Sequence, residues 1–201
     1  MSFRLEEKIF TPRVNSFEFK KWLFSNGGKI LYPQRIINSV YFDNELKMYL
    51  DSIEGITPRK KIRLRTYNNK FFFESNNFKK EVKITYFNYR DKIVDNYLIN
   101  NSLSNITIKD KDYGICKPII NIIYLRNYFL FKGIRITLDE NITYFHIKNN
   151  KISNFFVKDK EKIIEIKSSN LNKYDFLKEL FPLPRSRFSK YCRGIELLNI
   201  Y

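Results

Sequence analysis

The chain has little of what would brace a small fold covalently or anchor it in a lipid bilayer. Only two of its 201 residues are cysteine, Cys116 and Cys192, which is too few for a disulfide framework and shows no spacing typical of a zinc site. We expect both to be ordinary buried thiols. No apolar run approaches the ~20 residues of a membrane-spanning helix, and the charged N-terminal residues lack the apolar core of a signal peptide. The sequence therefore predicts a soluble cytoplasmic protein.

Several common catalytic and architectural patterns are also missing. The single histidine, His146, lies in a stretch that we expect to be rich in turns, and it is an unpromising general base. No G-x-x-x-x-G-K-[ST] motif occurs, which excludes a P-loop mechanism. The chain has no internal repeat, no low-complexity tract and no linker rich in Pro, Gly or Ser. Its length then suits a single domain over residues 1–201.

Positive charge is what the chain has in excess. Lys and Arg number 37 against 21 Asp and Glu, a formal net charge of +16, and the surplus runs along the whole chain. Such a balance predicts a polyanionic partner: phosphate chains, nucleic acid or an anionic membrane. Hydrophobic residues make up 43% and aromatic residues 17% of the chain, which excludes a disordered basic tail.

The sequence pattern predicts that most of the chain forms short strands separated by turn residues. We expect a hairpin around Lys132-Gly133, because Gly supplies the positive φ of a tight turn, and a second pair formed by 155–157 with 162–167. The strands are predicted at 3–10, 29–42, 60–67, 71–74, 79–86, 92–98, 119–131, 134–140, 155–157 and 162–167. Helical segments are predicted at 17–25, 44–51, 171–180 and 189–198, with Trp22 and the phenylalanines of the first helix packed in the core.

A strand sends residues i and i+2 to the same face, and about six of the expected strands then have one apolar face and one charged face. The charged faces carry Glu6 and Lys8; Lys61, Arg63 and Arg65; Glu81 and Lys83; Tyr124 and Arg126; Arg135, Thr137 and Asp139; and Glu165 and Lys167. A solvated face of an antiparallel sheet explains any one of them. Six together indicate a wide, wet barrel whose charged lumen holds a counter-charged ligand.

Seven segments, in order along nearly the whole chain, resemble the polyphosphate polymerase domain of the vacuolar transporter chaperone (VTC) type, within the triphosphate tunnel metalloenzymes. The opening Glu6-Glu7-Lys8 is similar to the E-x-K motif of those enzymes. The VTC-like segments are Ser39-Val40-Tyr41-Phe42-Asp43, 59–65 (Arg-Lys-Lys-Ile-Arg-Leu-Arg), Glu81-Val82-Lys83 with Arg90 and Lys92, Tyr124-Leu125-Arg126, 135–139 (Arg-Ile-Thr-Leu-Asp), Ile164-Glu165-Ile166-Lys167, and Phe188-Ser189-Lys190-Tyr191.

The resemblance implies a mainly β, α+β fold: an eight-stranded antiparallel β-barrel tunnel with a charged lumen and a few flanking helices. It implies catalytic or phosphate-contacting roles for Lys8, Arg63, Arg65, Lys83, Arg126, Arg135 and Lys190, with Lys61, Lys92 and Lys167 as further phosphate-binding residues. The metal would be Mn²⁺ or Mg²⁺, held by Glu165 with Glu6 and Glu81 as helpers. Lysine and arginine suit phosphate oxygens, and carboxylates suit hard cations.

Two departures accompany this resemblance. Leu5 stands where the family usually has Tyr, and residues 71–80 read as an insertion, so Glu74 competes with Glu81 for the E-x-K position. We favour Glu81, because Lys83 follows it at i+2 whereas Asn76 follows Glu74.

The implied reaction is transfer of the ATP γ-phosphoryl group to a growing polyphosphate chain. Such a transfer relies on positioning and charge neutralisation, and an anionic phosphate nucleophile needs no general base. A metal-dependent tripolyphosphatase or nucleoside triphosphatase could use the same residues, with a carboxylate orienting water. A non-enzymatic module that binds polyphosphate or RNA is a third possibility. RNA is disfavoured, because the cations alternate with carboxylates and not with exposed aromatic stacking platforms.

Overall fold

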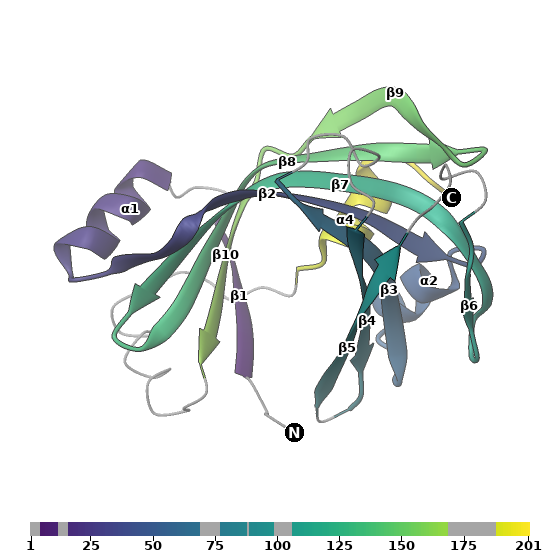
Figure 1. Cartoon of the computed structure of the whole chain (residues 1–201), viewed down its shortest axis with the longest axis horizontal. Helices are drawn as coiled ribbons and strands as arrows, with labels where there is room; N and C mark the ends of the chain where they lie inside the picture. Colours follow the sequence, from purple (N-terminus) through teal and green to yellow (C-terminus); the bar gives the residue numbers. More distant parts are fainter. Residues whose placement is uncertain (1–4, 12–15, 69–76, 88, 99–105, 169–187) are drawn as a thin grey trace. The chain divides into compact units, whose positions relative to one another are not determined.

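A computed structural model describes residues 5–11, 16–68, 77–87, 89–98, 106–168 and 188–201. Figure 1 labels their ten strands and three helices. The strands are β1 (Leu5–Thr11), β2 (Lys29–Asp43), β3 (Arg59–Tyr67), β4 (Asn77–Thr85), β5 (Arg90–Leu98), β6 (Ile108–Asp110), β7 (Gly114–Phe131), β8 (Ile134–Lys148), β9 (Lys151–Lys158) and β10 (Lys162–Ser168). The helices are α1 (Ser16–Ser25), α2 (Lys47–Glu54) and α4 (Lys190–Leu197).

All ten strands belong to one sheet, and eight of them follow the order β1-β10-β8-β7-β2-β3-β4-β5. The short β6 pairs with β7, and β9 pairs with β8. The pairings β1–β10, β10–β8, β2–β3, β3–β4 and β4–β5 are all antiparallel. The path of eight antiparallel strands is the mainly β fold that the sequence predicts. Among the described strands it ends at β1 and β5 and does not close into a barrel.

The predicted hairpin is present, and its strands are longer than predicted. Lys132 and Gly133 have φ values of 47° and 76°, as a two-residue turn with both central residues in the left-handed region requires. Strand β8 continues to Lys148 past Asn141, which has φ 54°. Asparagine tolerates that region, so the strand is locally irregular without ending. His146 therefore lies on β8 and not in a turn-rich stretch.

The pairing predicted for residues 155–157 is wrong. Strand β9 pairs antiparallel with β8, with Thr143 opposite Lys158 and Lys148 opposite Lys151. Asn149 and Asn150 join these strands and have φ values of 50° and 57°, the backbone of a tight hairpin. Strand β10 instead pairs with β1 and with the other half of β8.

The chain divides into two compact units, to which β2, β7 and β8 all contribute. Unit 1 comprises residues 1–35, 124–142 and 159–188. Within it Phe19 and Leu23 of α1 pack with Phe129, Phe131 and apolar residues of β8 and β10. The Trp22 ring lies 5.4 Å from that of Phe131. The prediction that the phenylalanines of this helix are buried is wrong for Phe17 and Phe24, which are 69% and 45% exposed. These two lie seven residues apart on a face of the helix other than that of Phe19, although the Phe24 ring still contacts Phe129.

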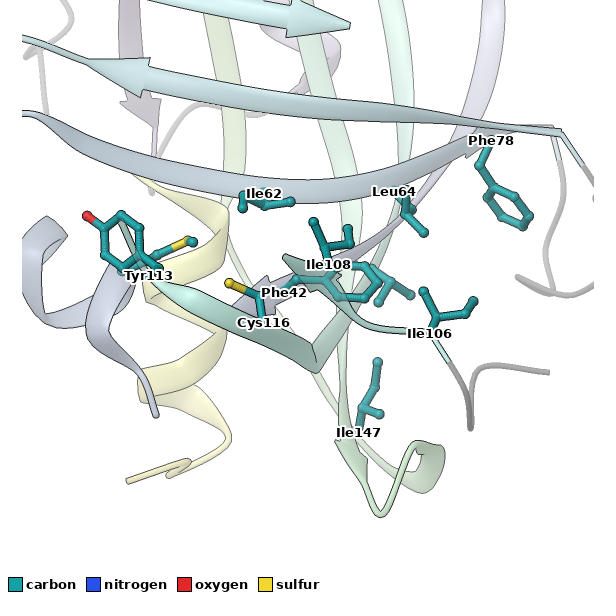
Figure 2. Packing of buried hydrophobic residues seen from close by; sticks show 11 residues of the cluster. Phe42, Ile62, Leu64, Phe78, Ile106, Ile108, Tyr113, Cys116 and Ile147 are labelled. Atoms are coloured by element: carbon teal, nitrogen blue, oxygen red, sulfur yellow. The ribbon is translucent and has the colours of Figure 1, made fainter. Parts of the chain in front are cut away.

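Unit 2 comprises residues 36–123, 143–158 and 189–201. Its core, shown in Figure 2, gathers side chains from β2, β3, β4, β6, β7 and β8. Ile62 and Leu64 of β3 are 1% and 0% exposed, so the apolar face of this strand is fully packed. The alternate residues Lys61, Arg63 and Arg65 must then point to the other face. Burial of one side of β3 thus fixes the direction of its cations.

Cys116 and Cys192 are both buried free thiols, as predicted. No helix in the described part of the chain is long and apolar enough to cross a membrane. The predicted strand at 71–74, the candidate Glu74 and the predicted helix at 171–180 lie outside the described residues.

Candidate phosphate-binding site

In unit 2, a single face of β3, β4 and β5 carries the five cations and the one carboxylate that the sequence analysis assigned to these strands. The antiparallel register places Lys61 opposite Lys83, Arg63 opposite Glu81, and Lys83 opposite Lys92. Residues directly opposite one another share a face of the sheet, and Arg65 follows Arg63 at i+2. The structure therefore brings together all six residues that the sequence analysis assigned to these strands.

Glu81 lies at the centre of this group and contacts three of the cations. Its Oε2 accepts from Nε of Arg63 at 2.6 Å and lies 3.6 Å from Nη1 of Arg65. Its Oε1 accepts from Nζ of Lys92 at 2.7 Å. Burial would raise the pKa of Glu81, but Arg63, Arg65 and Lys92 lower it well below its ordinary value. Glu81 is thus an ionised counter-ion that holds the arginines together and cannot neutralise all of them.

Two side chains of β2 complete the positioning of the arginines. Nη1 of Arg63 donates to the Tyr41 hydroxyl at 2.6 Å, and its guanidinium lies over the Tyr41 ring. Nε of Arg65 donates to Oγ of Ser39 at 3.1 Å. Burial would raise the pKa of Tyr41, but Arg63, Arg65 and Lys190 lower it. Both arginines are therefore held in fixed orientations, which lowers the entropy lost when they bind a ligand.

The helix that carries Lys190 is fastened to β2 by one buried carboxylate. Oδ2 of Asp43 accepts from the Tyr191 hydroxyl at 2.5 Å and from the Tyr49 amide at 3.0 Å. Its Oδ1 accepts from the Met48 amide at 3.0 Å. Asp43 thus satisfies amides at the start of α2 and also binds α4. Burial, the largest influence, raises the pKa of Asp43 in spite of these bonds.

Further contacts fix α4 against the same face. Lys61 Nζ donates to Ser189 Oγ at 2.7 Å, and Ser189 also caps the helix by accepting from the Cys192 amide. The Tyr41 and Tyr191 rings stack with centroids 5.2 Å apart. Gly194 lies so close to Ile120 and Tyr144 that an added Cβ would overlap both side chains. Lys190 at the first turn of α4 is thereby placed near Tyr41 and its arginine neighbours.

Unit 1 contains a second, smaller group of charges on β7, β8 and β10. Arg126 binds Asp139 through two hydrogen bonds, 2.6 Å from Nε to Oδ1 and 2.7 Å from Nη2 to Oδ2. Glu165 lies 3.6 Å from the same arginine and 3.0 Å from Nζ of Lys167. Burial would lower the pKa of Arg126, but Asp139, Tyr124 and Glu165 raise it well above its ordinary value. Arg126 is therefore permanently charged and already paired.

The remaining predicted residues of unit 1 lie along the same strands. Arg135 of β8 is the register partner of Lys167 on β10. On β1, Glu6 is opposite Lys167 and Lys8 is opposite Glu165. The predicted residues of the N-terminal strand thus align with those of β10 along the backbone.

The residues around Glu165 fit a divalent metal that takes its other ligands from phosphate and water. Thr137, 2% exposed, is the register partner of Glu165, and its hydroxyl has no hydrogen-bond partner among the described residues. A carboxylate and a hydroxyl on one face are the hard oxygen donors that Mg²⁺ and Mn²⁺ prefer. No group of three or more His, Cys, Asp or Glu suited to a metal occurs in the described part of the chain. Among the described residues, Glu81 contacts three cations, whereas Glu165 contacts two, Arg126 and Lys167.

Sequence reasoning named the cations but missed the groups that position them. Tyr41, Asp43, Ser189 and Tyr191 all belong to motifs quoted for the family resemblance, yet only Lys190 among those segments was given a role. The signal available was alternation, since Ser39 and Tyr41 interrupt apolar residues on β2. Nothing local indicates that Tyr191 bonds Asp43, which lies 148 residues earlier.

Comparisons with known proteins give a family match and a similar solved fold. A profile of the VTC domain family matches residues 4–199. The fold is similar to that of a solved Vibrio parahaemolyticus protein that bears the provisional name adenylate cyclase, with a TM-score of 0.54, 15% sequence identity and coverage of 98% of each chain. No curated protein sequence matches the chain.

Proposed function

Because the chain belongs to the VTC domain family, we propose that it is a metal-dependent phosphotransferase that moves the γ-phosphoryl group of ATP to the end of a polyphosphate chain. The observation that supports this most is the face of β3, β4 and β5, where the candidate cations share one face with a single carboxylate, Glu81. Such a face retains positive charge after all internal pairing. A substrate with several adjacent negative charges is what it would bind best.

The arrangement suits phosphoryl transfer because it is fixed before the substrate arrives. Arg63 and Arg65 are held by Tyr41, Ser39 and Glu81, so their N–H groups already point in set directions. Preorganised donors of this kind stabilise charge that develops on the transferring phosphoryl group without reorganisation cost. The proposed role of these arginines is to bind and orient phosphate oxygens, with Lys61, Lys83, Lys92 and Lys190 neutralising the rest of the chain.

In unit 1, Glu165 and the Thr137 hydroxyl would hold Mn²⁺ or Mg²⁺, with Glu6 as the predicted third donor. When bound, the ion would neutralise negative charge on the phosphate groups. Nζ of Lys167 lies 3.0 Å from Oε1 of Glu165 and orients that carboxylate. We propose that Lys8, Arg126 and Arg135 bind phosphate from the same unit.

The first experiment is incubation of the purified protein with ATP and Mn²⁺ or Mg²⁺, with products separated by gel electrophoresis and chromatography. ADP together with chains longer than triphosphate supports the polymerase. If the product is orthophosphate without chains, the proposal of a polymerase is replaced by that of a triphosphatase. If the products are a cyclic nucleotide and pyrophosphate, the proposal of a polymerase is replaced by that of an adenylate cyclase, the activity for which the Vibrio protein is named. Binding of polyphosphate with no turnover would leave a binding module.

A matched pair of lysines tests the site itself. Lys83 lies on the charged face of β4, whereas Lys80 lies on the opposite face of the same strand, opposite Leu64 and Asp95. Lys83→Ala should lower kcat/KM by roughly 10- to 100-fold, since a hydrogen bond to a charged group is lost. Lys80→Ala should leave it unchanged. Equal effects of the two changes would contradict the assignment of this face.

Glu165→Gln tests the proposed metal position. We expect turnover to be lost and the concentration of Mn²⁺ that supports residual activity to rise, because an anionic ligand has been replaced. Binding of tripolyphosphate in the presence of a chelator should persist. Unchanged metal dependence in this variant would remove Glu165 from the metal site.

A further inference from the structure

Unit 1 contains a second arginine–tyrosine cluster, of which the proposed phosphate site accounts only for Arg135. It consists of Tyr32 and Arg35 on β2, Tyr128 on β7 and Arg135 on β8. The Arg35 guanidinium carbon lies 5.8 Å from the centroids of both Tyr32 and Tyr128. The Arg135 guanidinium carbon lies 5.4 Å from the centroid of Tyr128. The two tyrosine rings meet edge to face, 5.7 Å apart.

The charges of this cluster distinguish it from the arginine–tyrosine contact of unit 2. Arg63 lies over Tyr41 and is neutralised by Glu81. In contrast, neither Arg35 nor Arg135 forms an ion pair with a carboxylate of the described residues, although both lie on the same ring. Nε of Arg135 is also buried without a hydrogen-bond acceptor within those residues. Two cations that share one ring repel each other, and a nearby anion would offset this repulsion.

The exposed part of the cluster is aromatic and planar. Tyr32 is 47% exposed although it is a large ring, and Arg35 is also exposed. A tyrosine ring and a guanidinium are both flat groups on which a nucleobase stacks. At its other end the cluster reaches Arg135, the register partner of Lys167. A phosphate-binding end and a stacking end thus occur in one contiguous group.

From this arrangement we infer that Tyr32 and Arg35 form a platform for the base of a nucleoside triphosphate, whose phosphates lie toward Arg135 and Lys167. This inference rests on the proposed function and adds a residue-level account of how a nucleotide is distinguished from an inorganic phosphate chain. Stacking is tolerant of base identity, so the platform selects for the presence of a base more than for adenine.

The test compares two ligands that differ by the nucleoside, ATP and inorganic tripolyphosphate, by isothermal titration. Tyr32→Ala should weaken ATP binding by about 5- to 100-fold, the range typical of a lost base stack, and should leave tripolyphosphate binding unchanged. Tyr32→Phe keeps the ring and should bind ATP as the wild type does. Arg35→Lys keeps the charge without the planar group and should weaken ATP more than tripolyphosphate.

Tyr67→Ala is the matched control, because Tyr67 is a comparably exposed tyrosine, 37% exposed, at the end of β3 in unit 2. It should alter neither affinity. Equal losses for ATP and tripolyphosphate in Tyr32→Ala, or no loss for either, would overturn the platform. Wild-type protein that binds tripolyphosphate but not ATP would overturn the platform and spare the phosphate site. Wild-type protein that binds neither ligand would overturn both proposals.

Discussion

Individual cations of the proposed site differ in what already neutralises them. Nε and Nη2 of Arg126 both donate to the fully buried carboxylate of Asp139, so an incoming phosphate must compete with a well-placed carboxylate. Arg35 and Arg135 meet no carboxylate among the described residues. Because an ion pair must be weakened before its members bind elsewhere, we expect Arg126 to contribute more to the stability of unit 1 and Arg135 more to ligand affinity.

The hydroxyl group of Tyr191 should contribute to the stability of the protein through one hydrogen bond. Tyr191→Phe removes the hydroxyl that donates to the buried Asp43 and leaves the stacked ring in place. We expect a loss of about 1–3 kcal/mol in the free energy of unfolding, since a hydrogen bond to a buried carboxylate is removed. Urea unfolding followed by circular dichroism measures it. Tyr201→Phe, at an 83% exposed residue, is the control, and an equal loss there would contradict the role of Asp43.

At the scale of elements, the charged face of β3, β4 and β5 could be predicted because its cause is local. Alternation places Lys61, Arg63 and Arg65 on one side of β3 as soon as Ile62 and Leu64 are buried. The partner of β9 could not be predicted in the same way. Segments 155–157 and 162–167 are both strand-like and adjacent in sequence, and the choice of β8 as partner depends on the Asn149-Asn150 turn and on which core each strand joins.

The residues of the candidate site likewise fall into those that a local sequence pattern could predict and those that it could not. Six cations and carboxylates of the central strands could be assigned from spacing and family resemblance, since each motif is a short stretch of sequence. The bond between Asp43 and Tyr191 and the arginine–tyrosine cluster of unit 1 could not, because they join residues of different strands or helices. Contacts of that kind follow from the register of the sheet and not from any local pattern.

Glu81, the counter-ion on the charged face of β3, β4 and β5, should make the stability of the protein depend on pH. The pKa of Glu81 is lowered from 4.5 by folding, so its contribution is fully present above about pH 4.5 and is lost as the pH falls below that value. Glu81→Gln should therefore destabilise the protein at neutral pH, and the difference from the wild type should shrink as the pH falls below about 4.5. Denaturant unfolding of both proteins at several pH values measures it. A difference independent of pH would mean that Glu81 is not charged in the folded state.

At the scale of the whole molecule, the net charge of +16 governs how polyanions approach. Charge of one sign distributed along the chain raises the local concentration of an oppositely charged ligand and makes its binding sensitive to ionic strength. The cationic excess that destabilises the folded protein by self-repulsion is thus relieved when a phosphate chain binds. We expect polyphosphate to stabilise the protein against heat as well as to bind it.

Long-chain polyphosphate should bind with a steep salt dependence. If about five cations contact phosphate, the dissociation constant should rise roughly 100-fold or more between about 50 and 200 mM salt, because condensed counter-ions are released on binding. ADP carries fewer charges and should show a shallower slope in the same titration series. Equal slopes for the two ligands would indicate that only a few cations contact the chain.

The bond between Asp43 and Tyr191 also constrains how the protein is made. Tyr191 follows Asp43 by 148 residues, so Asp43 must remain without this partner until those residues are synthesised. The hydrogen bond that joins Asp43 to α4 is therefore missing while all the strands of unit 2 are being made. The candidate face of β3, β4 and β5 can be completed only when α4 docks, so this docking must follow the synthesis of all three strands.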